Sequence, residues 1–328
     1  MKKSRFAGLL LLLPVTFLAG CGGGTPALSL SANWYLDNTL SENRTDEKEE
    51  VLEYKITYKP EGTDSDFTVS YDEGTYKTSL RSERRTLADG TDATVYVYST
   101  EMSITGRYSF GSETSEDFTD SVKTEAVFRN VTKGLQPLSS SRTVNTTSPT
   151  KLTPSSLEGA YKYYSFTYET EYDEALENAT ITYTDLITEG ATPVVTELSL
   201  DEEEGTYFDN EQLLFALRGA NLTSIITFRT LNQVQRQVQS LATSEPTSTT
   251  VELKGANIGG TVSDYTVDAV KVNLSYQTTH SGGTQALWYA KTGTPNNWRN
   301  VLLYMEAPII YGMGSLCYTL TYADFTDK

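Results

Sequence analysis

The side chains able to carry out chemistry are few in this 328-residue sequence, and their spacing matches no catalytic constellation. A serine hydrolase needs a histidine beside a serine and an acid, but His280 is the single histidine and the sequence has no G-x-S-x-G turn. Cys317 lies in an apolar stretch without a neighbouring histidine or basic residue to activate it, so we expect an inert thiol. The sequence therefore predicts a protein that is not an enzyme.

Metal ions and cofactors are not expected either. One histidine and one free cysteine cannot supply the nitrogen and sulfur ligands of a closed zinc site. The runs "ADGTD" (88–92) and "DEEEG" (201–205) gather oxygen atoms, but neither has the D-x-D-x-D-G spacing of a calcium loop, and acidic runs are usually solvated turns. A carboxylate pair for glycoside cleavage stays open, because separation in space decides that mechanism.

The N-terminus indicates where the protein works. "MKKSR" is basic and "FAGLLLLLPVTFL" is apolar but too short to span a bilayer comfortably, which is typical of an export signal. The junction "LAGC" at 18–21 resembles the lipobox of bacterial lipoproteins, in which the cysteine receives a diacylglyceryl group. The resemblance implies a signal peptide over 1–20 and a lipid anchor at Cys21, and two acyl chains give stable membrane attachment.

Such an anchor predicts an extracytoplasmic protein on the cell membrane, or on the outer membrane if the cell has two. Loss of the signal peptide removes Lys2, Lys3 and Arg5, so the formal net charge changes from −17 by three to −20. Because this field repels nucleic acid, we expect no nucleic-acid partner. If Cys21 is acylated, no intrachain disulfide can form, and the fold must be stable through packing. The oligomeric state stays open.

The rest of the chain is typical of antiparallel β-structure after a flexible tether over 21–50. From residue 51 onward apolar and polar residues alternate, so that Tyr54 and Tyr58 share one face of the first strand. Four alternating stretches near the C-terminus, separated by turn residues, predict consecutive antiparallel neighbours. We interpret the Ser-, Thr- and Pro-rich stretch 132–159 as a long surface connection inside a single domain over 51–328.

The stretch "YFDNEQLLFALRGANL" has the start signals of a helix over 210–218. Asp209 stands where an N-cap belongs, and Gln212 three residues later completes a capping-box-like pair. Phe208 and Leu213 occupy the positions of a hydrophobic staple. These signals predict a helix in a chain that otherwise favours strands.

The end of this helix is also marked. Arg218 suits the dipole in the last turn, and Gly219 can take the left-handed conformation that ends a helix. Leu214, Phe215 and Leu217 leave it little polar surface, and a short apolar helix is rarely stable unless buried. We therefore expect it to lie across the concave face of the sheet.

The C-terminal half resembles a family of bacterial extracytoplasmic proteins of unknown function. The resemblance rests on "YFDNEQLLFALRG", then "VDAVKVNLS", "TQALWYAK", "RNVLLYME" and "YGMGSLCYTL", and covers about residues 160–328. That family is similar to the lipoprotein carriers LolA and LolB, in which a half-barrel sheet curls over helices and shelters acyl chains. The resemblance implies a curved antiparallel sheet (a half-barrel) wrapped over one or two short helices.

A second helix is an open alternative within 222–242. Val234, Val238 and Leu241 are spaced as on one helix face, but the same segment reads equally well as a strand. The carriers hold several helices in their concavity, whereas this sequence has one with clear caps. Because this sequence has fewer helices than the carriers, it stays open whether the protein binds cargo as they do.

Five side chains are our candidates for contact with an apolar ligand. The 22 tyrosines have two readings, sheet packing or the lining of an amphipathic pocket. Trp288 shares a face with Ala286 and Ala290, which leaves room for the indole to lie against the helix or a ligand. The candidate contacts are Leu214, Phe215, Trp288, Tyr54 and Tyr58.

The sequence thus predicts a mainly β, membrane-anchored extracytoplasmic protein with two candidate functions. The first is non-enzymatic binding of an apolar or lipid-like ligand between sheet and helix, by analogy of fold. The second is a cell-envelope interaction module whose concavity is filled core without a ligand. The two differ in whether space remains beside Leu214, Phe215 and Trp288.

Overall fold

The computed structural model describes residues 49–61, 65–87, 89–131, 134–200, 207–220, 222, 225–244, 248–276, 283–291 and 300–324. The expected signal peptide, Cys21, most of the expected tether and His280 lie outside these ranges. Among the described residues, no helix is long and apolar enough to cross a membrane.

Eighteen strands of the described chain form one sheet, interrupted by a short helical segment. The helical elements are η3 (Asn210–Gln212), α1 (Leu213–Ala216), η4 (Leu217–Gly219) and η5 (Ile310–Gly312). The strands are β1 (Glu49–Lys59), β2 (Phe67–Tyr71), β3 (Gly74–Thr86), β4 (Asp92–Phe110), β5 (Glu113–Thr114), β6 (Phe118–Val131), β7 (Gly134–Pro149), β8 (Tyr161–Tyr172), β9 (Asn178–Asp185), β10 (Val194–Ser199), β11 (Tyr207–Asp209), β12 (Ile226–Asn232), β13 (Gln235–Thr243), β14 (Thr249–Ile258), β15 (Thr261–Tyr276), β16 (Gln285–Ala290), β17 (Leu302–Pro308) and β18 (Ser315–Asp324).

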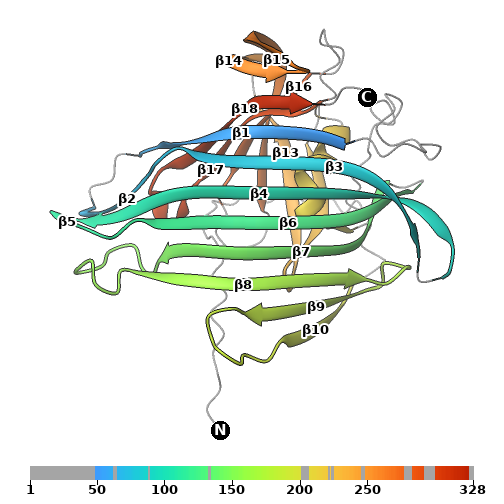
Figure 1. The fold of residues 1–328 in the computed structure, drawn as a ribbon, viewed down its shortest axis with the longest axis horizontal. Helices are drawn as coiled ribbons and strands as arrows, with labels where there is room; N and C mark the ends of the chain where they lie inside the picture. The colour runs from blue at the N-terminus through green and yellow to red at the C-terminus, as the bar shows by residue number, and fades with distance from the viewer. Residues whose placement is uncertain are drawn as a thin grey trace.

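Two antiparallel meanders make up the sheet. The first runs β1, β3, β4, β6, β7, β8, β9, β10, with β2 and β5 attached to β4. The second runs β12, β13, β15, β16, β17, β18, with β14 attached to β15. The meanders join because β1 pairs with β18, so the first and last described strands are neighbours in the middle of the sheet (Figure 1).

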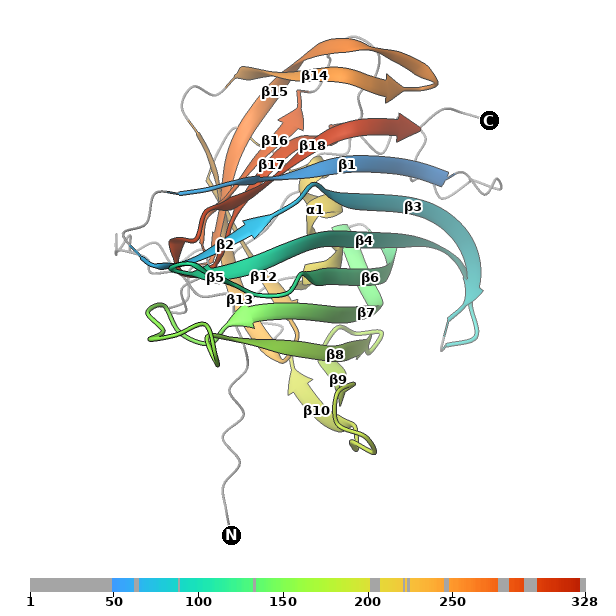
Figure 2. The ribbon, with the colours of Figure 1, turned by 60° about the vertical axis from the view of Figure 1, so that its left-hand side comes forward.

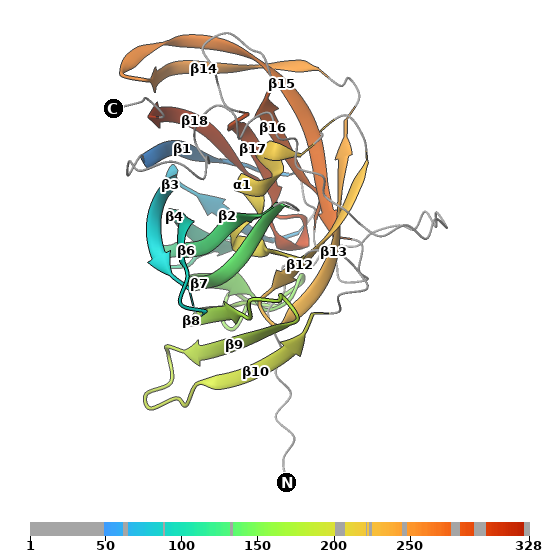
Figure 3. The same ribbon diagram turned by 90° about the vertical axis from the view of Figure 1, so that its right-hand side faces the viewer.

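The sheet curls around the helical segment. Figures 2 and 3 show α1 between the strands of the first meander and those of the second. The short strand β11 pairs in parallel with β12, and Asp209 at its end accepts a hydrogen bond from Ser140 of β7. The far end of the second meander therefore lies inside the curve of the first. The predicted fold class, a curved and mainly antiparallel sheet over a short helix, is confirmed.

The alternation in the sequence determines which side chains face inward. In β1, Leu52, Tyr54 and Ile56 are buried, while Glu53 and Lys55 point outward. The predicted C-terminal neighbours β15 to β18 also pair consecutively as expected. Because one face of each strand is buried, apolar and polar residues alternate along the sequence, and the strands could be predicted from this alternation.

Two expected boundaries are corrected. β1 begins at Glu49, so the last two residues of the expected tether belong to the sheet. The expected surface connection 132–159 instead contains the strand β7, which pairs with β6 on one side and β8 on the other. Its serines and threonines do not prevent pairing, and Pro137 fits because it lies at a break in the register with β6.

Within 222–242 the residues from 226 onward form the strands β12 and β13 with a turn between them, and not a second helix. β12 and β13 form an antiparallel hairpin, and Gln233 takes a positive φ of 54° in its turn. The helical spacing of Val234, Val238 and Leu241 is therefore coincidental, since Val238 and Leu241 fall on opposite faces of β13.

The predicted helix is present but is regular α-helix only over α1, between two 3₁₀ turns. Asp209 caps its start by accepting the Glu211 amide proton at 2.7 Å. Gln212 does not complete a capping box, because its amide donates to the Leu135 carbonyl. Gly219 is not left-handed, and the chain leaves through extended Ala220. The Asn300 side chain donates to the Arg218 carbonyl, so this helix end needs no glycine motif.

Arg218 has a different partner from the helix dipole that the sequence suggests. Its guanidinium donates two hydrogen bonds to the Glu50 carboxylate, at 2.5 and 3.1 Å, and both side chains are 4% exposed. It also lies over the Phe215 ring, 5.3 Å from the centroid. Burial alone would lower the Arg218 pKa, but the Glu50 carboxylate raises it, so the cation is retained. The pair fastens the end of the helix to the start of β1.

We predict that Arg218→Met lowers the free energy of unfolding by about 3 to 5 kcal/mol, because it leaves the Glu50 carboxylate buried without a cation. The double variant Glu50→Gln, Arg218→Met should recover part of this loss, since no charge then stays buried. Urea unfolding followed by fluorescence measures both. The control is Lys77→Met, which removes an exposed pair with Glu53 at 3.4 Å and should change the midpoint little. Equal losses in Arg218→Met and Lys77→Met would contradict the account.

Candidate functional site

Two of the predicted ligand contacts, Tyr54 and Phe215, belong to the main core. Phe215 is 1% exposed and packs between Tyr98 and Phe128, with ring centroids 5.5 Å apart in each case. Tyr54 is 2% exposed and donates its hydroxyl hydrogen bond to the Leu302 carbonyl at 2.8 Å. Protein side chains therefore occupy the position that we expected an apolar ligand to share with the helix.

Leu214 and Tyr58 are both half-buried, at different places. Leu214 packs at the margin of the main core, and its carbonyl accepts a hydrogen bond from the Tyr289 hydroxyl at 3.1 Å. Tyr58 belongs to a second apolar cluster and donates to the Met313 carbonyl at 2.8 Å. The structure thus does not bring the five predicted contacts together into one site.

Trp288 lies away from Tyr54 and Phe215, on the other side of its strand from the fully buried residues. In β16, Leu287 and Tyr289 are fully buried on the inner face, so Trp288 between them points to the outer face. There its indole lies 4.8 Å from the Tyr304 ring and 4.7 Å from the Lys271 ammonium. Trp288 is half-buried at the margin of the main core, and its neighbours Tyr304 and Lys271 could not be read from the alternation, which assigns residues to faces without saying which face is inner.

Cys317 is a buried free thiol. Among the residues that the structure describes, no three His, Cys, Asp or Glu side chains gather closely enough to hold a metal ion. The run 201–205 and His280 lie outside the described residues, as does Cys21.

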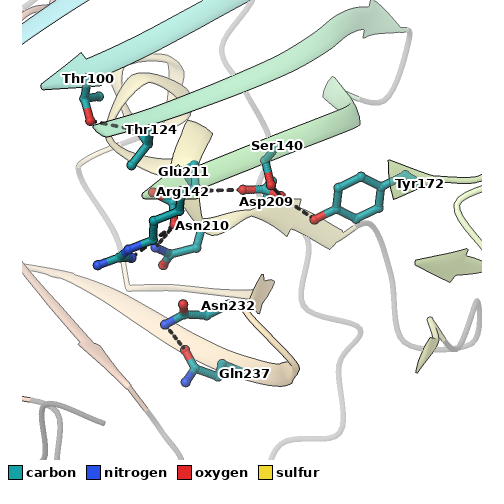
Figure 4. Close-up of polar contacts among 10 residues, drawn as sticks. All are labelled: Thr100, Thr124, Ser140, Arg142, Tyr172, Asp209, Asn210, Glu211, Asn232 and Gln237. Carbon is teal, nitrogen blue, oxygen red and sulfur yellow. Dashed lines mark hydrogen bonds and ion pairs between the residues drawn. The ribbon is translucent and has the colours of Figure 1, made fainter. Parts of the chain in front are cut away.

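A separate polar group of side chains surrounds the start of the helix. Asp209 is 2% exposed, and its Oδ2 accepts hydrogen bonds from the Ser140 hydroxyl at 2.6 Å and the Tyr172 hydroxyl at 2.5 Å (Figure 4). Burial, and then the nearby Glu211 carboxylate, raise the pKa of Asp209 to about 6 despite these bonds. Through these hydrogen bonds the Asp209 carboxyl group links β7 and β8 to the start of the helix.

Arg142 extends this group along the inner face of β7. Its guanidinium donates to the Glu211 carboxylate at 3.1 Å, and the side chain remains 25% exposed. On the neighbouring strands β4 and β6, Thr100 and Thr124 share a hydrogen bond of 2.8 Å. Arg142 is paired in register with Thr124 of β6, so these polar side chains follow one row across the sheet.

The β12–β13 hairpin supplies the opposite side. Its inner face carries a row of amides and a hydroxyl: Gln239 donates to Thr230 at 2.7 Å, and Asn232 donates to Gln237 at 3.4 Å. Figure 4 shows Arg142 and Asn210 on the side of the helix start that looks toward Asn232 and Gln237. We call the following side chains the inner polar cluster: Thr100, Thr124, Ser140, Arg142, Tyr172, Asp209, Asn210, Glu211, Gln212, Thr230, Asn232, Gln237 and Gln239.

The inner polar cluster contains buried atoms that lack a hydrogen-bond partner among the described residues. They are Arg142 Nε, Gln212 Oε1, Asn232 Oδ1 and Gln239 Oε1. Both glutamines are completely buried. Because buried polar atoms are nearly always paired, these four atoms give the inner polar cluster hydrogen-bonding capacity that the described residues do not use.

Aromatic rings continue the inner face beyond Arg142. Tyr168 pairs in register with Arg142, and its ring lies 5.0 Å from Tyr183 and 5.6 Å from Phe166. All three rings are half-buried. This part of the concave face therefore combines a cation with partly open aromatic surface.

Sequence reasoning missed this cluster, although one signal was present. Gln235, Gln237 and Gln239 recur at every second position of "NQVQRQVQ", which in a strand places three amides on one face. The spacing of Val234, Val238 and Leu241 in the same segment also fits a helix, and in a helix these three amides would not share one face.

Comparisons with protein-family models and with curated proteins give no match. Among solved structures, the chain is similar to a beta-barrel-like protein of the domain of unknown function DUF1849 from Brucella abortus, at 7% sequence identity and a TM-score of 0.47. The match covers 85% of this chain and 98% of that one. The description of this chain as barrel-like rests on its own strand pairing.

We predict that Asp209 makes the free energy of unfolding depend on pH in a way that the Asp209→Asn variant lacks. Its folded pKa of about 6 lies above the ordinary value near 4, so the folded state holds this proton more tightly than the unfolded state. The resulting stability is fully present below about pH 4 and is lost as the pH rises through about 6. Relative to Asp209→Asn, the wild type should lose about 2 kcal/mol of unfolding free energy between pH 4 and 7.

Urea unfolding at a series of pH values measures this difference. The control is Asp185→Asn, because hydrogen bonds from the Ile187 amide and Thr188 lower the pKa of that exposed carboxyl. Its difference from the wild type should change in the opposite direction, decreasing as the pH falls. A pH-independent difference for Asp209→Asn would show that this carboxyl titrates normally.

Proposed function

We propose that the chain is a lipid-anchored, extracytoplasmic, non-enzymatic binding protein whose ligand contacts the inner polar cluster. The observation that carries this proposal is the set of unpaired buried atoms at Arg142, Gln212, Asn232 and Gln239. The lipobox-like "LAGC" and the export signal support the location and the anchor at Cys21. The barrel-like sheet supplies a rigid frame for the cluster.

The chemistry of the cluster favours a polar ligand over the apolar one expected from sequence. Three of the unpaired atoms are amide oxygens that accept hydrogen bonds, and the fourth is a guanidinium N–H that donates one. Hydroxyl groups match both, because each donates and accepts. The neighbouring rings of Phe166, Tyr168 and Tyr183 suit a ligand that also has a flat or C–H-rich face.

A binding role fits the carboxylates better than a catalytic one. Both oxygens of Asp209 accept hydrogen bonds from protein donors, and Glu211 is paired with Arg142. A general acid or base must be able to reach a reacting atom, and these groups are used in holding the fold.

A second candidate function is the cell-envelope interaction module with a filled core. The observation that favours it is the exposure of apolar side chains at β10, where Val194 is 44% and Val195 61% exposed. The two candidates are compatible, because β10 and the inner polar cluster lie on different parts of the sheet.

We predict that the full chain, solubilised from its own membranes, carries a polar small molecule that native mass spectrometry detects and denaturing extraction removes. Arg142→Gln should reduce occupancy about 10- to 100-fold, since a hydrogen bond to a charged group contributes about 1.5 to 3 kcal/mol. The matched control is Lys123→Gln on the neighbouring strand β6, whose side chain points outward and pairs with Glu101. A mass equal to that of the acylated polypeptide alone in every preparation would sink the proposal and leave water as the partner of the unpaired atoms.

A further inference from the structure

The β9–β10 hairpin concentrates exposed apolar side chains in a short stretch. Leu186, Ile187, Val194 and Val195 are 49%, 51%, 44% and 61% exposed. Val194 and Val195 are adjacent in β10 and point to opposite faces of the strand, so apolar side chains are exposed on both of its sides.

β10 lies at an edge of the sheet (Figures 1 and 3). It pairs with β9 from Val194 to Ser199 without a break in register, and no other described strand pairs with it. Exposed edges are normally protected by lysine, proline or a bulge within the strand. "VVTELS" has none of these within the strand, with Pro193 directly before it, and carries one charge, at Glu197. On its outer edge the Ser199 carbonyl accepts a hydrogen bond from the Arg236 side chain at 3.1 Å, so Val195 and Glu197 supply the backbone N–H and C=O groups that another strand would pair with.

We propose that a second copy of this chain occupies this edge, with the two β10 strands antiparallel across a two-fold axis. For the faces of the two sheets to continue, residues of the same face must lie opposite one another. A register centred on Glu197 would put the two carboxylates opposite each other, which is unfavourable. A register centred on Thr196 avoids this and places Thr196 opposite its own copy.

The Thr196-centred register is self-complementary along the strand. Val194 lies opposite Leu198 of the second copy, which joins apolar side chains, and Val195 lies opposite Glu197. Threonine pairs across strands are themselves favourable. The Thr196-centred register therefore allows the edge to pair with its own sequence without opposing like charges.

The net charge of −17 on each copy opposes this association. Salt screens repulsion between exposed charges, so the dimer should form more readily at higher ionic strength. Attachment to a membrane would raise the local concentration of the chain and act in the same direction. Association through β10 does not depend on a ligand at the inner polar cluster.

Cysteine crosslinking of the full chain tests the register. Opposed residues in an antiparallel pair have Cα atoms about 4.5 to 5.5 Å apart, which a disulfide can bridge. Thr196→Cys should give a covalent dimer under mild oxidation at least tenfold faster than Val262→Cys, a control at a 68% exposed position on another hairpin. The wild type, oxidised under the same conditions, is the control for crosslinks that form through the two cysteines already in the sequence.

Sedimentation velocity of the wild type provides the second readout. The account expects a dimer that increases with concentration and salt, and a monomer for Thr196→Lys, in which two lysines would be opposed. Equal crosslinking of Thr196→Cys and Val262→Cys, or a wild type that stays monomeric at high concentration and salt, would overturn the proposal. Crosslinks of Thr196→Cys in membranes exclusively to other proteins would overturn it too.

Discussion

The buried ion pair between Arg218 and Glu50 is the constraint on which the rest of the structure depends. It joins two residues that are 168 positions apart, one at the end of the only described helix of the interior and one at the start of the strand that unites the two meanders. Tyr54 and Tyr98 lie near it, and burial raises the pKa of Tyr98 to about 12, so these rings stay neutral beside the pair. Such a pair contributes little net stability compared with apolar side chains of the same volume, but removing one partner is costly. Its role is to fix the position of the helix.

The position of the helix divides the interior of the sheet into two regions with different chemistry. From Leu213 to Leu217 the helix packs against aromatic and aliphatic side chains, and this region is filled core. At its start, Asp209 and Glu211 link it to Ser140, Tyr172 and Arg142, opposite the amides of the β12–β13 hairpin. The ligand site that we propose therefore lies at the polar region and not at the apolar one. The helical segment therefore fills the core with its apolar residues and positions the inner polar cluster at its start.

The sequence predicted those features that depend on neighbours along the chain. The alternation in β1, the consecutive C-terminal strands and the Asp209 cap are local, and all three are present. Features that depend on distant partners were not predictable: Arg218 suits a helix dipole as well as it suits Glu50, and the alternation around Trp288 does not say which face is inner. β7 was missed because its serines and threonines resemble a loop until β6 and β8 are placed on both sides. The glutamines of β13 were readable as one polar face, but only once the segment was known to be a strand.

Native-state hydrogen exchange tests most directly whether the helix is a fixed part of the core. The amides of Leu213, Leu217 and Ala220 donate hydrogen bonds within the helical segment, and those of β1 and β18 pair in the middle of the sheet. The account predicts that the helical amides exchange only through global unfolding, with the same free energy as the amides of Tyr54 and Leu320. Exchange of the helical amides at a clearly lower free energy than those of the sheet would show that the helix opens independently, and would contradict the account.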